Sequence, residues 1–581
     1  MKVFYKLLMV SVLGLVIVSC SKDRTREQQL SAMISEIDSP FLVASMNLQN
    51  LMDKSEVMKE GTLPFTYYQV ISFFLAVELT GIDYNTDAQF VMGKGESFLP
   101  SFYGIFKVDK EELFTTLLEV EANAEIKEKD GFKYAIKEKE SYCLAWNEEF
   151  AVISSIPMDL AALLSGKGNG GEKQIDKNIA IIKAGEEGEI NEDYVAFLEN
   201  DADIAMMYDG KPFYQYMKTM SMEDSENLEK MKDIYEGMKY EIYLNFNKGN
   251  VELEMVADLD KELKEQLNFI GDKGVSAKLF DYGKSKSPLL TGGYKVDIAG
   301  FLDYFKGISE EDYNKMTEDL TEAGMEIEDI KVAFSGEMVY MVDEVVEREV
   351  VYDFGYNEPI VMKEQDASFG IVIGLSNKKI IEDKMKEIMM MQTTGNDLAS
   401  NEQDPGFDMA DMPKMEVLPN GVIQTGEAFI YLGSDILFMS NDSAWTNMVV
   451  AGTSVKVNNP NGILTDKAMG MYADLTKLSP MGDMDEEQAQ MLKMFSSFSG
   501  SANLDGGKFT INMSDDSQNS LKLITIAVGT ALAEIEKSMD PELESELEDA
   551  IENGEDAWDK LDEEFKDVDI EEIEEEVKKS I

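Results

Sequence analysis

Three aspartates that share one stretch of the chain are the first residues whose type and spacing could do chemistry. Asp404, Asp408 and Asp411 lie between Gly395 and Met415, a segment rich in turn-forming residues. Calcium takes oxygen ligands and needs no histidine, so calcium binding is the metal chemistry that they could support. The ligand order of an EF-hand loop is absent. They are weak candidate metal ligands, and the sequence predicts no obligatory cofactor.

Paired acids are a second source of candidate chemistry. Glu148 with Glu149, or Asp483 with Asp485, could flank a glycosidic bond as the two carboxylates of a glycoside hydrolase do. The chain has 113 Asp and Glu residues, however, and such side chains are mostly solvated. We therefore interpret both pairs as surface, and a calcium-assisted hydrolase is only a remote functional hypothesis.

Cys143 is the thiol that could act as a nucleophile. It lies between Tyr142 and Leu144 in an alternating, strand-like run, with no histidine or arginine nearby to lower its pKa. The sequence predicts a small buried hydrophobic residue. The other cysteine is Cys20, so a structural disulfide within the mature chain is not expected.

The residue types that the chain lacks argue against several classes of function. The chain has no histidine, which removes the usual general base and zinc ligand. Arginine occurs only at Arg24, Arg26 and Arg348, so bidentate donors for phosphate are scarce. The charge of 53 − 113 = −60 argues against nucleic-acid binding, which needs cations. The sequence predicts a protein that is not an enzyme.

Methionine is abundant, with 38 residues that include Met206-Met207 and a run at Met389 to Met391. Thioethers suit adaptable apolar binding surfaces, but they also fill irregular cores. At helical spacing the core interpretation is favoured. The glycine-rich run from Gly166 to Gly171 lacks the order of a phosphate-binding loop and is interpreted as a flexible loop.

The N-terminal segment has the features of an export signal. Lys2 and Lys6 precede an apolar stretch from Leu7 to Val18, and Ser19 stands before Cys20. Residues 1–19 are predicted to be a signal peptide, too short for a permanent membrane span. The segment resembles a bacterial lipobox, which implies acylation of Cys20, an outer-membrane lipoprotein that faces the periplasm or the surface, and a membrane partner through that lipid. Residues 20–37 are expected to form a polar tether.

Five blocks of sequence recur in the same order, which indicates an internal duplication. The paired blocks are Ser39–Met52 with Ser287–Leu302, Ser101–Val120 with Ser368–Ile388, Phe132–Ser154 with Val422–Ser440, Ile204–Asp209 with Met469–Asp474, and Tyr240–Leu259 with Ser499–Ser517. Each copy combines strand pairs with interposed helices. Alternation such as that of Tyr240, Ile242, Leu244 and Phe246 is expected to place one face in a core.

The predicted fold class is therefore α+β, with two tandem related modules over 38–262 and 280–518. Each is expected to be a mostly antiparallel twisted sheet with helices on one face. Residues 519–581 differ in kind, since Asp540 to Ile581 is strongly acidic with apolar residues at helical spacing, Trp558 and Phe565 among them. We expect an acidic helical region that either docks on the second module or projects.

Several of these features together resemble the large lipoproteins of unknown function found in Bacteroides-type bacteria. The resemblance is carried by the lipobox, by the strand that ends in Val-Ala-Ser-Met-Asn-Leu at Val43 to Leu48, by Leu51 to Ser55, by Gly81-Ile82-Asp83, and by the two hairpin-rich modules. It implies an envelope location, and it identifies no catalytic or ligand residue that could be carried over to this sequence.

Three functional hypotheses follow. The first is a non-enzymatic scaffold or binding module for another macromolecule of the cell envelope, a protein or a glycan. The second is a carrier for an apolar or glycan ligand that uses methionine and aromatic side chains on a sheet. The third is the calcium-assisted hydrolase.

Overall fold

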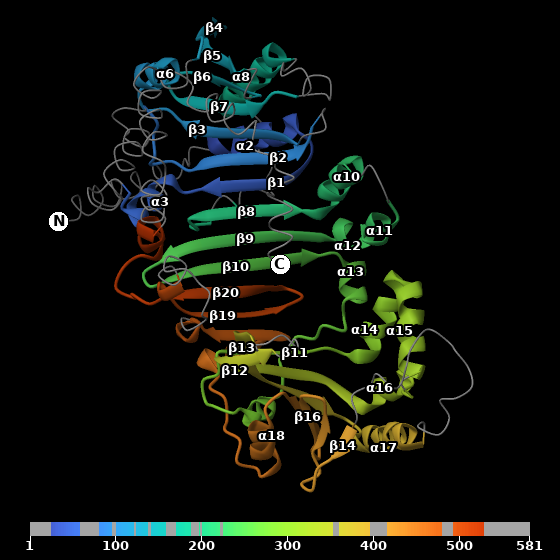
Figure 1. Cartoon of the computed structure of the whole chain (residues 1–581). Coiled ribbons are helices and arrows are strands. Elements are labelled where there is room, and N and C mark those ends of the chain that lie inside the picture. Colours follow the sequence, from blue (N-terminus) through green and yellow to red (C-terminus); the bar gives the residue numbers. More distant parts are fainter. Residues whose placement is uncertain are drawn as a thin grey trace, which may run out of the picture.

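In the computed structural model, the described part of the chain builds its strands into one sheet. The structure describes residues 25–57, 81–95, 100–120, 124–137, 141–157, 170–187, 197, 200–220, 225–322, 324–352, 360–394, 415–478 and 492–527. Within them a single 20-stranded sheet carries helices beside it (Figure 1). Every pairing between its strands is antiparallel. The predicted α+β class is confirmed.

The first half of the chain forms one half of this sheet. From the outer edge inward, its strands are β4 (Lys127–Lys129), β5 (Phe132–Lys137), β6 (Tyr142–Trp146), β7 (Phe150–Ser155), β3 (Ser101–Lys107), β2 (Ala88–Lys94), β1 (Asp38–Met46), β8 (Ile204–Asp209), β9 (Met238–Asn247) and β10 (Asn250–Leu259).

The second half of the chain forms the rest. From the opposite edge inward come β14 (Met415–Val417), β15 (Ile423–Thr425), β16 (Ala428–Leu432), β17 (Ile436–Ser440), β13 (Ile360–Leu375), β12 (Phe334–Tyr352), β11 (Leu290–Lys295), β18 (Met469–Asp474), β19 (Phe495–Asn503) and β20 (Gly506–Met513). Strands β10 and β20 pair with each other, so the sheet is continuous where a separate sheet per module was predicted.

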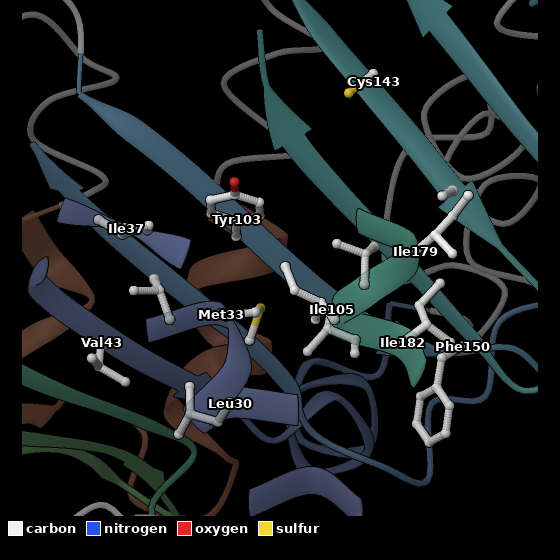
Figure 2. Close-up of a cluster of buried hydrophobic side chains, with 14 of the residues drawn as sticks. Leu30, Met33, Ile37, Val43, Tyr103, Ile105, Cys143, Phe150, Ile179 and Ile182 are labelled. Carbon is white, nitrogen blue, oxygen red and sulfur yellow. The ribbon is translucent and has the colours of Figure 1, made fainter. Parts of the chain in front are cut away.

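Helices cover both faces of the outer strands, so the expectation of helices on one face is wrong. In β6, Cys143 and Ala145 join the core under α8 (Gly171–Glu187), whereas Leu144 and Trp146 join the core under α6 (Glu111–Val120). The reason is that β6, YCLAW, is apolar at successive positions, and successive side chains of a strand point to opposite faces. Figure 2 shows the α8-side cluster, in which Ile179 and Ile182 lie beside Phe150.

The second half repeats this two-sided arrangement. On one face, α18 (Ser443–Val450) and the short 3-10 helix η2 (Ala277–Tyr282) cover Phe438, with Trp445 fully buried at their centre. On the other, α16 (Ile327–Ala333) and α17 (Lys378–Thr394) cover Leu437. Residues 437 and 438 are neighbours in one strand, so these two cores lie on opposite faces.

The remaining helices connect the strands. They are α3 (Leu48–Ser55), α10 (Gly210–Met220), α11 (Ser225–Lys230), α12 (Lys232–Glu236), α13 (Lys261–Gln266), α14 (Ile298–Ile308), α15 (Glu310–Glu322) and α19 (Ile463–Asp466), with the 3-10 turns η5 (Pro460–Gly462) and η6 (Leu475–Lys477). In Figure 1, α10 and α12 to α15 lie together at one end of the strands. Asp260 and Asp297 begin α13 and α14 by accepting backbone N–H groups.

The predicted tether over 20–37 is wrong for its second part. Residues Thr25–Glu36 form a helix, α2, whose Leu30 and Met33 are fully buried against the sheet (Figure 2). Leu30 and Met33, three residues apart, share one face of α2, and Ile37 directly after the helix joins the same core. The polar residues at the start of α2 obscure this pattern in the sequence. The folded body therefore begins no later than Thr25.

Each recurring block of sequence forms the same kind of element in both halves. The block pair at Ile204 and Met469, for example, forms β8 and β18, and the pair at Tyr240 and Ser499 forms the hairpins β9–β10 and β19–β20. The module boundaries at 38–262 and 280–518 stay a prediction. Of the region 519–581, residues 520–527 are helical, and the acidic stretch from Asp540 onward lies outside the described residues.

Candidate functional site

The six strands at the middle of the sheet separate apolar from polar side chains. These strands are β8, β9, β10, β20, β19 and β18 in spatial order. In β9 the sequence YEIYLNFN alternates, so that Tyr240, Ile242 and Leu244 share one face while Glu241 lies on the other. Because residues directly opposite each other in an antiparallel pair share a face, the registers define each face across all six strands.

We call one of these surfaces the apolar face. None of its side chains in the six strands is charged, although 29% of the chain's residues are. Most of its large side chains are half-buried, and Met469 is 45% exposed. Its members are Ile204, Met206, Tyr208, Tyr240, Ile242, Leu244, Phe246, Val251, Leu253, Met255, Ala257, Gly507, Phe509, Ile511, Phe498, Gly500, Ala502, Met469, Met471 and Ala473.

The apolar face continues beyond these six strands on both sides. Phe90 of β2 and Phe102 of β3 extend it into the first half, with ring centroids 5.8 Å apart. Tyr294 of β11 and Tyr340 of β12 extend it into the second half. The apolar face thus extends from β3 in the first half to β12 in the second half.

The tyrosines on this face keep it neutral. Tyr340 donates its hydroxyl hydrogen to the thioether of Met471 at 3.4 Å, and Tyr294 donates to Met338 at 3.3 Å. Burial raises the pKa of Tyr208, Tyr240 and Tyr340 above the usual value of a phenol. These hydroxyls therefore stay protonated at physiological pH, and their partners include sulfur atoms of the same face.

Glycines flatten the apolar face under aromatic rings. A Cβ atom at Gly292 would overlap the ring and hydroxyl of Tyr340, which crosses β11 on its way to Met471. A Cβ at Gly500 would overlap the ring of Phe509 on the neighbouring strand. Both rings lie against the backbone of the adjacent strand because glycine leaves that space open.

The opposite face of the same strands is mostly polar on β10, β20 and β19, whereas Ala205 and Met207 of β8 and Tyr472 of β18 pack against buried cores on that side. Lys508 of β20 pairs with Glu252 of β10 at 2.7 Å, and Ser499 and Thr510 face each other across β19 and β20. An antiparallel sheet that is wet on one side shows this division, with its other side against apolar material. The arrangement therefore marks the apolar face as the side that needs a cover.

The sequence predicts a core position for Tyr240, Ile242, Leu244 and Phe246, but their side chains are less deeply buried than that. They do share one face, but all four are half-buried, and none belongs to the buried cores. The described helices that form those cores cover the outer strands, and they reach β8 and β9 only on the opposite face, at Ala205, Met207 and Tyr243. The Met206-Met207 pair is split, since Met206 lies on the apolar face while Met207 packs against the α8-side core. On α17, Met390 is 59% exposed.

A polar cluster near α18 is the other arrangement with potential chemistry. Lys284 lies 2.6 Å from Glu344 and 3.1 Å from Asp442, and Ser368 donates to Asp442 at 3.0 Å. Burial alone would lower the pKa of Lys284, but its hydrogen bonds to the two carboxylates raise it. A lysine held in its charged form does not serve as a general base for Ser368.

The aspartate of this cluster has a structural task. Asp442 begins α18 by accepting the N–H groups of Ala444 and Trp445. Burial would raise its pKa, but the N–H of Trp445 and the ammonium of Lys284 hold it below the usual value. The cluster therefore anchors α18 and its buried Trp445 to β13 through Ser368 and to residue 284.

The other candidate residues from the sequence lie apart from both of these arrangements or outside the described residues. Cys20, Asp404, Asp408, Asp411, Asp483 and Asp485 lie outside the described residues. Glu148 and Glu149 are exposed in the turn between β6 and β7. Cys143 is fully buried, as predicted, and burial raises the pKa of its thiol to about 11, against the opposing hydrogen bonds of Ser154 and Asn178. Within the described ranges, no three acidic or cysteine side chains gather in a way that could hold a metal ion.

Sequence reasoning found the alternation but missed the width of the apolar face. The pattern is legible in VELEMVA of β10 and KFTINM of β20 as well as in β9. The pattern does not reveal that β10 and β20 lie side by side and join the faces of both halves. Leu253 and Phe509, which face each other there, are 256 residues apart in the sequence. The Lys284 cluster likewise joins residues 60 to 158 positions apart.

Comparisons with known proteins assign no family. No protein-family model and no curated protein sequence matches the chain. Among solved structures, crystal form III of TP0453 aligns with a TM-score of 0.24 and 10% identity over 41% of this chain and 86% of that one. Crystal form I gives 0.24, 10%, 42% and 86%. Alignments this loose show neither fold nor function. Within the described residues, no helix is both long and apolar enough to cross a lipid bilayer.

Proposed function

We propose that this protein is a non-enzymatic binding protein that holds a neutral, apolar ligand, such as the acyl chains of a lipid, on the apolar face. One observation carries the proposal. Six neighbouring strands present a face without a charged side chain, half-buried and rich in methionine and aromatic rings. Covering such a surface is favourable at about 25 cal/mol per Å² of apolar area.

The chemistry of the face selects among the ligands expected from the sequence. A glycan needs several hydrogen-bonding groups at its site, and the apolar face offers mainly tyrosine hydroxyls, of which Tyr294 and Tyr340 already donate to thioethers. A second copy of the chain is disfavoured because two molecules of charge −60 repel each other. A neutral acyl chain needs neither hydrogen bonds nor countercharge. Methionine adapts to such a flexible ligand.

The location belongs to the same proposal. The lipobox-like run before Cys20 supports a lipid anchor, and an anchored body would stand close to a bilayer, which is a source of acyl chains. We expect metabolic labelling with an alkyne fatty acid in the native host to mark the wild type and not a Cys20→Ala variant. A labelled Cys20→Ala variant, or an unlabelled wild type, would argue against the anchor without touching the apolar face.

The binding test uses two adjacent residues of β10. Met255 lies on the apolar face, and Val256, 41% exposed, lies on the polar face of the same strand. We expect Met255→Lys to weaken binding of a neutral diacylglycerol with one fluorescent acyl chain by about tenfold or more, because the bound chain would desolvate an ammonium group. Val256→Lys should bind like the wild type.

The same two variants also define the results that would contradict the proposal. Mass spectrometry under native conditions of protein purified from its host should show a bound lipid that Met255→Lys lacks and Val256→Lys keeps. Equal binding by both variants, or a wild type that binds no apolar probe, would contradict the proposed function. Thermal unfolding of both variants shows that any loss of binding is not a loss of fold.

One specific observation favours the second candidate function, a scaffold for another macromolecule. Beyond Glu344 and Ser368, β12 and β13 pair only with each other among the described strands, because β11 reaches β12 only up to Val342 and β17 reaches β13 only from Gly370. No described strand pairs with the outer edges of this two-stranded arm, and unpaired strand edges are a surface on which a partner can add a strand. Shortening the arm should abolish crosslinking to a macromolecular partner and leave diacylglycerol binding intact.

A further inference from the structure

The two halves of the sheet follow one strand order. Read inward from each edge, the first half runs from β4 through β5, β6, β7, β3, β2, β1, β8 and β9 to β10, and the second half repeats this order from β14 to β20 with each label ten higher. The two last strands then pair in an antiparallel manner. This is the geometry of two copies related by a two-fold axis.

The register at the seam between β10 and β20 has the same symmetry. Leu253 lies three residues after Asn250, which closes the turn of its hairpin, and Phe509 lies three residues after Gly506, which closes the other. These two equivalent residues face each other. On one side Val251 faces Ile511, and on the other side their equivalents, Gly507 and Met255, face each other. Reciprocal pairing of this kind is what a two-fold axis requires.

We infer that the apolar face is one continuous site, built from two halves related by an approximate two-fold axis through the pair Leu253 and Phe509, and that it takes a single elongated apolar ligand lying across this seam. The inference rests on the proposed function and adds the shape and number of the ligand.

The side chains at the seam favour one long ligand over two short ones. No charged residue of the apolar face separates the halves, and the rings of Phe509 and Phe498 lie with centroids 6.3 Å apart at 25°. Gly507 on β20 carries no side chain that would form a ridge. From β8 to β18 there are five strand spacings, and at ~4.8 Å each they span roughly 24 Å. That distance suits an extended chain lying across the strands.

The test measures how affinity depends on ligand length. Neutral straight-chain alcohols of increasing length are titrated into the full-length protein by calorimetry. We expect one molecule of the longest alcohols per chain, with affinity rising about fourfold for each added methylene through the whole series. Phe509→Ala should weaken the longest alcohols by about tenfold and leave the shortest unchanged. Thr510→Ala, on the polar face of the same strand, is the matched control.

The outcomes separate this inference from the proposed function. Two long alcohols per chain, or an equal effect of Phe509→Ala on short and long alcohols, would overturn the single site across the seam while leaving apolar binding in place. If no alcohol binds the wild type, both fail. Phe509→Leu keeps an apolar side chain at the seam, so it supplies a folded variant for the same comparison if Phe509→Ala unfolds.

Discussion

At the scale of single residues, the described interior holds a buried charge by pairing it with an opposite one. Asp203 is the clearest case, since its side chain is fully buried. Both of its carboxylate oxygens lie 2.6 Å from the ammonium of Lys54, and one also accepts the N–H of Phe246. This residue therefore ties α3, which follows β1, to β9. An unpaired carboxylate at this position would be costly.

We expect Lys54→Met to lower the free energy of unfolding by about 3–5 kcal/mol, because it leaves the buried Asp203 carboxylate without a countercharge. Adding Asp203→Asn to this variant should restore part of the loss. Urea denaturation monitored by tryptophan fluorescence measures both. Lys261 pairs with Glu265 on the surface and is 91% exposed, so Lys261→Met should change nothing measurable. Equal effects of the two lysine substitutions would contradict the assigned role of Asp203.

The buried thiol of Cys143 makes a prediction about pH. Burial raises its pKa from 9.0 to about 11. A folded-state pKa above the unfolded value stabilises the fold fully below pH 9 and loses that contribution as the pH rises through about 11. Relative to Cys143→Ala, the wild type should thus lose stability in this alkaline window. At neutral pH, iodoacetamide should modify Cys143 only as fast as the protein unfolds. Rapid labelling of the native protein would show the thiol to be open.

At the scale of elements, the helices and strands follow local patterns, but their surroundings decide which face each one buries. The apolar pattern on α2 was present in the sequence, yet its polar first residues indicated a tether. Strand β6 carries apolar side chains on both faces, and only the packing of α6 and α8 shows why it does. The alternating strands in the middle meet no such pair of helices among those that form the described cores, so one of their faces stays half-buried.

At this scale we expect replacement of glycine by alanine to destabilise the fold in one element and to stabilise it in another. Gly500→Ala in β19 forces its new Cβ into the ring of Phe509 and should cost about 1–3 kcal/mol. Gly307→Ala in α14 meets nothing within 4 Å and should stabilise the protein by about 0.5–1 kcal/mol, because alanine loses less backbone entropy in a helix. Thermal unfolding measures both, and a shift of the same sign in both variants would contradict the close packing of Phe509.

At the scale of the whole molecule, a net charge of −60 acts against a compact fold. The apolar face lies within this strongly negative body, which would repel an anionic ligand from the site that we propose. The one continuous sheet also means that the two halves share a seam of backbone hydrogen bonds between β10 and β20.

Salt should therefore stabilise this protein. Raising the ionic strength shortens the screening length from about 30 Å at 0.01 M to about 8 Å at 0.15 M, which weakens repulsion among the carboxylates. We expect the unfolding midpoint to rise by several degrees in sodium chloride. Calcium chloride at matched ionic strength should give a similar rise. A rise with calcium alone would contradict simple screening and would direct attention back to Asp404, Asp408 and Asp411.

The sequence by itself determined the α+β class, the recurring blocks, the alternation in β9 and β10 and the burial of Cys143, because each depends on residues close together in the chain. Only the tertiary structure decided that β10 and β20 meet, that helices cover both faces of the outer strands, and that Lys54 reaches Asp203. The contacts between β10 and β20 and between Lys54 and Asp203 join residues more than a hundred positions apart. No local periodicity specifies such a partner, or the helix that covers a given face of a strand. The width of the apolar face belongs to this second group, because it exists only once both halves share one sheet.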